Sequence, residues 1–198
     1  MKVYCAVLGT VLGTVVASLA CDPLAAAERF KIDTDHTFAH FSVLHTGISS
    51  VRGRVGVSGG TATLDIENQT AEVTVELNLR TIDTGVKKLD ALLSDEMFFD
   101  VATHKTGRFA GRATQFNEGL PSAFEGELTL RGITRTVELK AERFACKQVK
   151  ILVLNRFVCG GDLQANVMRS DFGLDKYLSM VGDEVRLVIS VEAIRQEK

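Results

Sequence analysis

The chain contains 198 residues, of which 45% are hydrophobic, and its formal net charge is −2. Lysine and arginine are scattered among acidic residues, so the chain lacks the basic patch of a nucleic-acid-binding protein, and we expect no nucleic-acid partner. The length is sufficient for one domain with a sizeable apolar core, to which 11 Phe residues contribute volume.

The N-terminal segment has the features of a secretory signal peptide. A positive charge precedes an uncharged apolar run, and three alanines ending at Ala27 fit the cleavage rule. We therefore expect residues 1–27 to be removed and residues 28–198 to form one domain that is periplasmic or secreted. The competing interpretation is a lipoprotein acylated on Cys21, although a lipobox usually has Leu at the position of Ser18.

Alternation of apolar and polar residues is the clearest signal in the remaining sequence. In residues 71–79, every second residue is apolar and the residues between are polar, which is typical of a strand with one buried face. The same pattern recurs at residues 62–66, 124–130, 137–141, 163–167 and 185–191. Turn residues separate these runs at 59–60, 68–69, 117–119 and 132. Many short antiparallel strands with regular turns predict a β-sandwich or a β-barrel.

One short helix is expected between two of these strands. Apolar residues follow helical spacing over residues 86–93, and either Asp83 or Thr84 is placed to accept hydrogen bonds from the first free amides. The apolar face consists of Val86, Leu89, Leu92 and Leu93. A short helix in a sheet-rich fold lies over one end of the sheet or against one face, so this helix is a candidate lid. A second short helix is expected at residues 175–180.

Residues 56–60, GVSGG, match the G-x-S-x-G pattern of serine hydrolases. That chemistry requires a strand, a sharp turn at the serine and then a helix whose first amides help to form the oxyanion hole. Here alternating segments flank Ser58 on both sides, so the context is strand, turn, strand. We therefore interpret Ser58 as a turn residue, with a hairpin turn at Gly59-Gly60.

Three histidines, His36, His40 and His45, suggest a metal site, but strand geometry opposes it. On a strand, His36 and His40 lie roughly 13 Å apart and His45 points to the opposite face, whereas a metal ion binds nitrogen at about 2 Å. A β-bulge is the one device that would bring a pair together. We predict no metal site. His45 shares a strand face with Phe41 and Val43, so it is a candidate polar group among apolar ones.

Residues 169–173, RSDFG, contain the Asp-Phe-Gly triplet of protein kinases. The sequence has no glycine-rich phosphate loop, strand lysine or catalytic loop to accompany it, so a kinase is excluded. Arg169 and Asp171 are instead expected to pair or to form hydrogen bonds at the end of a strand. No convincing nucleophile with an oriented base occurs elsewhere, and we predict a binding protein, not an enzyme.

Two cysteines, Cys146 and Cys159, remain after the expected cleavage. An even number of cysteines in an oxidising compartment predicts one disulfide, which would stabilise the fold by roughly 3 kcal/mol in the chain-entropy model. The disulfide would join the strands of a hairpin whose connection includes residues 147–155. The alternative is a pair of buried free thiols.

Five blocks of sequence together resemble the YceI-like family of exported, polyisoprenoid-binding, lipocalin-like proteins. These blocks are FKIDTDHTFAHFSVLHTGISSVRGRV, LRTIDTGVKKLDALLSDEMFFDV, GELTLRGITRTVEL, RSDFG and DEVRLVISVEAIR. They cover nearly all of the expected mature chain in the family order, and the cysteine pair with CGGD is similar to a disulfide-bearing subset. Residues 103–106, THKT, depart from the Tyr-Pro usual in the family, which leaves the local turn open.

The resemblance implies an all-β, antiparallel, lipocalin-like barrel of about eight strands, with one or two short helices at its mouth. Such a barrel is wide enough for one slender ligand. The implied function is a carrier or reservoir for a long apolar chain, either a polyisoprenoid, an isoprenoid quinone or a fatty amide. A role in a stress response and transient contact with a membrane are expected, and no cofactor is implied. The alternatives are a hydrolase or isomerase acting in the same cavity, and a structural domain without a ligand.

The residues expected to contact the ligand come from the first strand, the helix and the segment after it. We expect the strand face with Phe41 and Val43 to point inward, because the other face carries His40 and Ser42. The predicted contacts are Phe41, Val43, His45, Leu89, Leu92, Leu93, Phe98, Phe99, Phe109, Arg169, Asp171 and Phe172. For a quinone head group, the candidate polar partners are His45, Arg169 and Asp171.

Overall fold

The structure is a computed structural model that describes residues 27–197. Most of the predicted signal peptide, and Cys21 with it, lie outside these residues. Within them, nine strands form one antiparallel sheet, with one α-helix and one 3₁₀ helix in the connections. The elements are β1 (Glu28–Ile32), β2 (Phe38–His45), β3 (Ser49–Asp65), β4 (Thr70–Asp83), α1 (Lys87–Ser94), β5 (Thr106–Asn117), β6 (Leu120–Leu130), β7 (Ile133–Ile151), β8 (Leu154–Met168), η1 (Arg169–Phe172) and β9 (Val181–Arg195).

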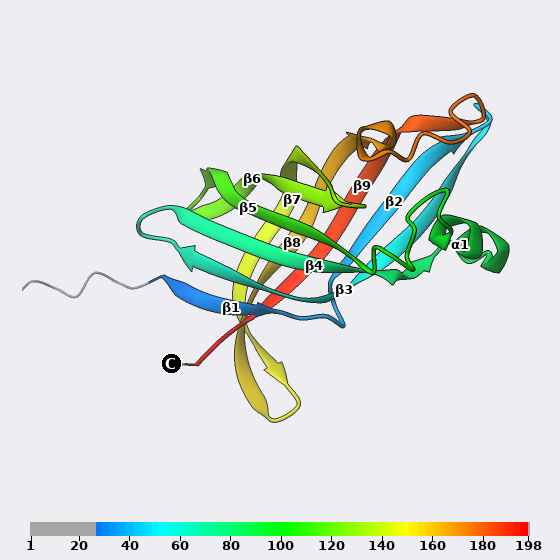
Figure 1. The fold of residues 1–198 in the computed structure, drawn as a ribbon. Helices are drawn as coiled ribbons and strands as arrows, with labels where there is room; N and C mark the ends of the chain where they lie inside the picture. Colours follow the sequence, from blue (N-terminus) through cyan, green and yellow to red (C-terminus); the bar gives the residue numbers. More distant parts are fainter. Residues whose placement is uncertain (1–26, 198) are drawn as a thin grey trace, which may run out of the picture.

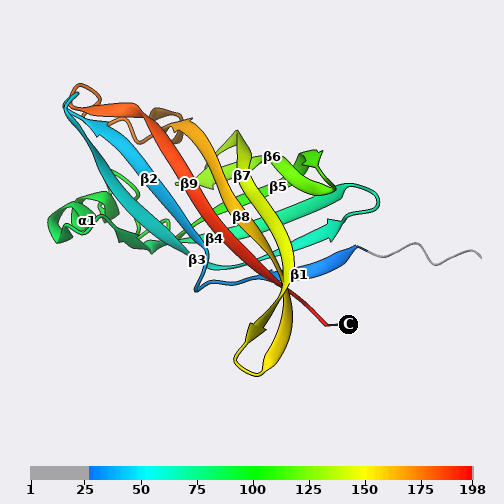
Figure 2. The ribbon, with the colours of Figure 1, turned by 180° about the vertical axis from the view of Figure 1, so that it is seen from behind.

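The sheet closes on itself to form a barrel (Figures 1 and 2). Each strand from β2 to β9 pairs with its neighbours in sequence, and β2 also pairs with β9, which completes a ring of eight strands. This confirms the predicted all-β fold and selects the barrel over the sandwich. Closure removes the unpaired strand edges that an open sheet exposes.

Strand β1 continues the strand position that β2 begins. On β3, residues 49–56 pair with β2 and residues 61–64 pair with β1. Strand β9 pairs with β2 as far as its residue Ser190, and it pairs with β1 from its residue Ala193 onward. The two strands therefore lie end to end along the same neighbours, with a bend at residues 34–36 between them. Sequence analysis did not predict β1, because alternation over five residues is too short to recognise.

The connections between strands fall at two ends of the barrel, because consecutive strands run in opposite directions. The β2–β3 turn, α1, the β6–β7 turn and η1 lie at one end, which we call the α1 end. The β3–β4 turn, the β5–β6 turn and the β7–β8 hairpin lie at the other, which we call the hairpin end (Figure 1). The β7–β8 hairpin extends well beyond the barrel wall in both views (Figures 1 and 2).

The Gly59-Gly60 pair lies within β3, so the predicted hairpin turn at this point is wrong. The pairing of β3 with β4 shifts register between Val57 and Gly59, as it does at a β-bulge. A Cβ atom on Gly60 would meet the Thr74 carbonyl oxygen of β4 and would lie 2.8 Å from Ile32 Cγ1, so the close approach of β4 and β1 requires glycine there. Ser58 is thus an exposed residue at a bulge in a long strand, and it is not at an elbow before a helix.

Helix α1 occupies the predicted segment, but its cap differs from the prediction. The N-cap residue is Val86, which makes no side-chain capping bond, so neither Asp83 nor Thr84 is the cap. Instead, Asp90 Oδ1 accepts hydrogen bonds from the Thr84 amide and hydroxyl, at 2.7 and 2.6 Å. Residues 175–180 form turns, so the second predicted helix is wrong. No helix in the described part of the chain is long and apolar enough to cross a membrane.

Candidate functional site

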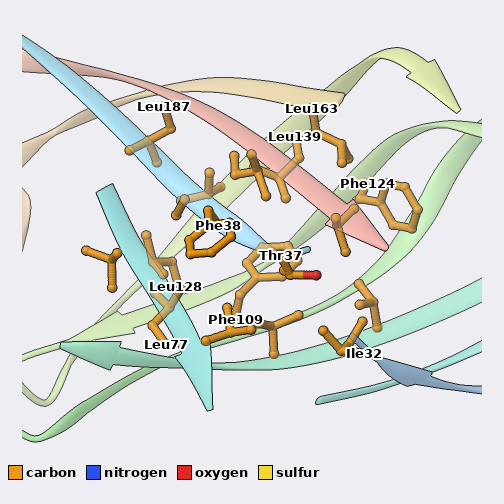
Figure 3. Close-up of a pocket in the computed structure, with 18 of the residues that line it drawn as sticks. Ile32, Thr37, Phe38, Leu77, Phe109, Phe124, Leu128, Leu139, Leu163 and Leu187 are labelled. Carbon is orange, nitrogen blue, oxygen red and sulfur yellow. The ribbon is translucent and has the colours of Figure 1, made fainter. Parts of the chain in front are cut away.

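The barrel interior contains a cavity of about 280 Å³. All nine strands contribute side chains to its wall, and Figure 3 shows Ile32, Phe109 and Leu187, from three different strands, facing the same space. At the α1 end, the wall is completed by Leu93 of α1 and by the Phe98-Phe99 pair that follows it. The segment between β4 and β5 therefore completes the cavity wall at the α1 end.

The alternation seen in the sequence builds this wall directly. Successive side chains of a strand point to opposite faces, so every second residue of each strand faces the interior. On β4 the interior residues are Ala71, Val73, Val75, Leu77 and Leu79. On β9 they are Val185, Leu187, Ile189 and Val191. The apolar face that was expected to be buried thus lines a cavity, and it is not packed against a second sheet.

Glycines on the strands make room for aromatic rings inside the barrel. A Cβ atom on Gly126 would lie 2.7 Å from Cζ of Phe109, and one on Gly111 would lie 2.9 Å from the same atom. The tip of the Phe109 ring therefore lies close to glycines of β5 and β6, and the Phe41 ring lies close to Gly53 of β3. Because these rings lie against the wall, the centre of the barrel remains open.

Few polar side chains reach the cavity wall. They are Thr37, Thr63, Glu72 and Arg169. The Thr37 hydroxyl is buried and is already bonded to the Glu192 backbone, since it donates to the carbonyl (3.3 Å) and accepts from the amide (3.2 Å). The Glu72 side chain belongs to an exposed residue at the hairpin end. The wall therefore offers an apolar chain almost no competing polar contact.

Arg169 is the buried charge at the wall, and backbone carbonyls hold it in place. Its guanidinium donates to the carbonyls of Gly182 (2.8 Å), Val181 (2.9 Å) and Leu174. Burial lowers the pKa of Arg169 from its ordinary value, and the nearby carboxylates of Asp183 and Asp175 oppose that shift. These bonds join η1 to the start of β9. The observed geometry is that of a structural clamp, not of a side chain free to bind a ligand head group.

The structure places eight of the twelve predicted contact residues on the cavity wall. They are Phe41, Val43, Leu93, Phe98, Phe99, Phe109, Arg169 and Phe172. Among them, Phe172 is the most deeply buried, with 1% of its surface exposed, and it packs against Phe109 and Leu128. The expected inward face of β2 is therefore the observed one at Phe41 and Val43.

The other four predicted residues lie away from the cavity. His45 is the last residue of β2, and the β2–β9 pairing shifts register between Val43 and His45, which interrupts the inward alternation. Leu89 and Leu92 belong to α1, which has no buried residue and directs only Leu93 to the wall. Asp171 is exposed on η1. None of His45, Arg169 and Asp171 is thus positioned as a free polar partner inside the barrel.

Several wall residues were not included among the predicted contacts. The largest are Phe30, Phe38, Phe124 and Phe144. For β6, the period-two pattern already identified Phe124 as part of an apolar face, and extending that face into a list of wall residues would have included it. Phe30 lies on the unpredicted β1, and Phe144 follows a bulge in the β7–β8 pairing between Ala141 and Arg143, which displaces the alternation.

The three histidines do not come together, but His36 lies close to the carboxylates of Asp33 and Glu192. Single ligand atoms of Asp33, His36 and Glu192 lie within 4.8 Å of one another at the surface. His36 Nδ1 contacts Asp33 Oδ2 at 2.9 Å, and this hydrogen bond raises the pKa of His36. The bend between β1 and β2 brings His36 close to Asp33, which explains their hydrogen bond.

The predicted disulfide joins Cys146 of β7 to Cys159 of β8. The two residues are directly opposite in the β7–β8 pairing, with Cα atoms 4.0 Å apart. This confirms the disulfide and excludes the alternative of two free thiols. Cys159 is buried and forms part of the cavity wall, so the bond connects the wall to the base of the projecting hairpin.

A closed eight-stranded barrel with an apolar interior and a framing segment at one end agrees with the family suggested by the sequence. The sequence model of the family described as the YceI-like domain matches residues 30–193 of this chain. The chain belongs to the YceI-like family. Its relatives include a UPF0312 protein of Pseudomonas paraeruginosa, 32% identical over 96% of this chain and 95% of that protein. Protein YceI of Salmonella arizonae is 30% identical over 94% of this chain and 97% of that protein.

Solved structures of YceI-like proteins share the fold at low sequence identity. A YceI protein of Campylobacter jejuni superposes with a TM-score of 0.60 at 20% identity, over 78% of this chain and 90% of that one. A polyisoprenoid-binding domain of Saccharophagus degradans gives a TM-score of 0.55 at 12% identity, over 84% of this chain and 98% of that one. At these identities the likeness concerns the fold alone.

Proposed function

We propose that this YceI-like protein is exported and carries or stores a long apolar chain inside its barrel. The observation that carries the proposal is the continuous apolar wall, in which the buried polar groups, Thr37 and Arg169, are already bonded to backbone. Such a wall recognises a hydrocarbon by excluding water from it. The description of the Saccharophagus degradans relative as polyisoprenoid-binding supports the same ligand class.

Burial of hydrocarbon supplies sufficient affinity without polar contacts. Each CH₂ group that leaves water contributes about 0.8 kcal/mol, so ten groups contribute roughly 8 kcal/mol before the cost of immobilising the chain. The buried polar groups of the wall are already bonded to backbone, and the remaining polar side chains, Thr63 and Glu72, come from the strands at the hairpin end, so we expect a polar head group to lie at an end of the cavity. This arrangement favours selection by chain length and width, and it accommodates polyisoprenoids, isoprenoid quinones and fatty amides alike.

Native mass spectrometry of the protein purified from its own cells tests the proposal. A carrier retains one apolar molecule, whose mass identifies the ligand after extraction into organic solvent. Recovery of the protein without any bound lipid, under conditions that preserve the fold, would support the alternative of a structural domain without a ligand. The mass of the mature N-terminus, in the same measurement, tests cleavage after Ala27 against acylation of Cys21.

A hydrolase acting in the same cavity is the second alternative, and the geometry around Ser58 opposes it. The Ser58 hydroxyl donates to the Glu76 carbonyl across a strand pair at 3.4 Å, and the residue is exposed. Among residues 27–197, no basic side chain forms a hydrogen bond with that hydroxyl. Ser58→Ala is therefore expected to leave ligand retention unchanged, whereas loss of a hydrolytic turnover in this variant would support the enzyme.

A further inference from the structure

The β7–β8 hairpin carries a projection that takes no part in the barrel. Pairing of β7 with β6 ends at Lys140, and pairing of β8 with β9 begins at Val158. We call residues 147–157, which lie between the disulfide-linked cysteines and before the pairing of β8 with β9 begins, the finger. Figures 1 and 2 show the finger extending away from the barrel wall at the hairpin end. A two-stranded ribbon is marginally stable by itself, so the Cys146–Cys159 bond at its base contributes to holding it in place.

The tip of the finger is apolar and fully in solvent. Leu152 is 90% exposed, Val153 is 85% exposed and Leu154 is 53% exposed. These three consecutive residues form the turn of the hairpin and the first residue after it, at the end of the projection. Single exposed apolar residues are common on soluble proteins, but an apolar cluster at the end of a projection marks a site of contact.

The chemistry of the turn supports a role for these side chains. Ile151 pairs with Leu154, which leaves Leu152 and Val153 as a two-residue turn, and Leu152 has a φ of 56°. A two-residue turn with positive φ favours glycine, asparagine or aspartate. Within residues 27–197, the other two-residue turns are Glu118-Gly119 and Arg131-Gly132, in which both positions have positive φ and the second is glycine. At the finger tip neither position holds one of these residue types, and the bulky leucine at position 152 has a positive φ, which supports a role for its side chain outside the turn itself.

Positive charge surrounds the tip. The sequence from Arg143 to Gly161 contains four basic residues and no Asp or Glu. Arg143 pairs with Asp162 of β8 at 2.6 Å, and Arg156 pairs with Glu197, just after β9, at 3.0 Å. Within residues 27–197, Lys147 and Lys150 of the finger form no ion pair. These two lysines lie behind the apolar tip, and their positive charges are thus available to contact an anionic surface.

We propose that the finger docks the protein on a bilayer that contains anionic phospholipid. The leucine and valine side chains enter the interfacial region, and Lys147 and Lys150 contact the phosphate groups above it. In a bilayer surface, hydrocarbon lies below a layer of negatively charged head groups. The finger matches this order, because its end is apolar and its lysines lie behind that end. The inference goes beyond the proposed function, because it does not depend on what the cavity contains. Docking at the hairpin end leaves the α1 end free of the bilayer.

Vesicle flotation tests the docking with a variant designed to fold. Leu152→Gly combined with Val153→Asn places the preferred turn residues at the tip, so the hairpin is retained while the apolar tip is lost. The full-length mature protein is mixed with vesicles of phosphatidylcholine and phosphatidylglycerol in equal amounts. Because each CH₂ group that leaves water changes partitioning about fourfold, we expect the variant to bind at least about tenfold more weakly.

Two further variants separate charge from apolar contact and from the other end of the barrel. Lys147→Gln with Lys150→Gln should weaken binding to the anionic vesicles about 25-fold, roughly fivefold for each lysine, and leave binding to pure phosphatidylcholine unchanged. Ile48→Thr removes an 85% exposed residue at the α1 end and should have no effect. Absence of binding by the unchanged protein, full binding by the Gly-Asn variant, or loss of binding only in Ile48→Thr would overturn the proposal. Ligand retention is scored separately, so failure of docking and failure of the carrier function are distinguishable.

Discussion

Phe98 and Tyr177 stack on one another at the α1 end of the barrel, with ring centroids 6.2 Å apart and planes inclined by 20°. Phe98 belongs to the cavity wall, whereas Tyr177 is 51% exposed in the loop between η1 and β9. The stack therefore joins the segment after α1 to the loop before β9 across the edge of the cavity. We expect this stack to hinder the passage of a chain at the α1 end.

Removal of the Tyr177 ring should accelerate release of a bound chain. An aromatic pair contributes about 0.5–1.5 kcal/mol, so Tyr177→Ala is expected to raise the release rate roughly two- to tenfold. Stopped-flow measurement of the release of a fluorescent fatty-acyl probe gives this rate, and Tyr177→Phe, which keeps the ring, is the matched control. Equal release rates for the alanine and phenylalanine variants would mean that the chain leaves by another route.

The disulfide should contribute to global stability as well as to the finger. Replacing both Cys146 and Cys159 by serine is expected to lower the free energy of unfolding by about 3 kcal/mol, because the unfolded chain is no longer constrained. Urea denaturation of the variant, compared with the oxidised and the reduced protein, measures the loss. The reduced protein and the double variant should agree. An unchanged midpoint after full reduction would contradict the prediction.

Arg169 should be a stability residue and not a ligand residue. Lysine cannot reproduce three hydrogen bonds to the carbonyls of Gly182, Val181 and Leu174, so Arg169→Lys is expected to cost about 2 kcal/mol or more in the free energy of unfolding. Thermal and urea unfolding provide the measurement. The opposite pattern, an unchanged stability with loss of bound lipid, would assign Arg169 to the ligand head group instead.

Stability should fall in acid through the contact between Ser170 and Asp183. The Asp183 carboxylate accepts hydrogen bonds from the Ser170 hydroxyl (2.7 Å) and amide (2.9 Å), and these bonds lower its pKa from the ordinary 3.8. A lowered pKa in the folded state means that the stabilisation is complete above pH 3.8 and is lost as the pH falls through the folded value.

Asp183→Asn tests this pH dependence. The variant should lose stability at neutral pH and should show a smaller decrease than the unchanged protein when the pH is lowered through and below 3.8. Urea midpoints recorded at successive pH values give both quantities. Identical slopes for the two proteins in this range would show that other carboxylates account for the acid sensitivity.

The barrel was predictable because period-two alternation specifies which face of each strand is buried. Residues 71–79 illustrate this, since their five apolar members all reach the interior. Alternation does not distinguish a wall packed on a second sheet from a wall that surrounds a cavity. That choice rests on the pairing of β2 with β9, which is a contact between distant parts of the chain, and only the family resemblance anticipated it.

The errors in prediction arise where the backbone departs from regular geometry. Gly59-Gly60 has the composition of a turn but accommodates a bulge and the close approach of Ile32. His45 follows Phe41 and Val43 in the alternation, yet a register shift precedes it. For α1, helical spacing identified the helix correctly, but the spacing alone does not give its rotation about its axis, and only Leu93 reaches the cavity.

The central claim is that the barrel interior holds the ligand, and the adjacent residues Val43 and Leu44 test it most directly. Val43 lies on the cavity wall, whereas Leu44 is 50% exposed on the outer face of the same strand. Tryptophan at either position adds the same ring system, but only Val43→Trp narrows the interior, at a cost in stability of about 1–3 kcal/mol.

Native mass spectrometry of the Val43→Trp and Leu44→Trp proteins, each purified from the source cells and checked for retained β-structure by circular dichroism, is the decisive measurement. If the ligand lies inside the barrel, Leu44→Trp retains the apolar molecule carried by the unchanged protein, and folded Val43→Trp has lost it. Full retention of that molecule by folded Val43→Trp would contradict binding inside the barrel and would place the ligand outside it.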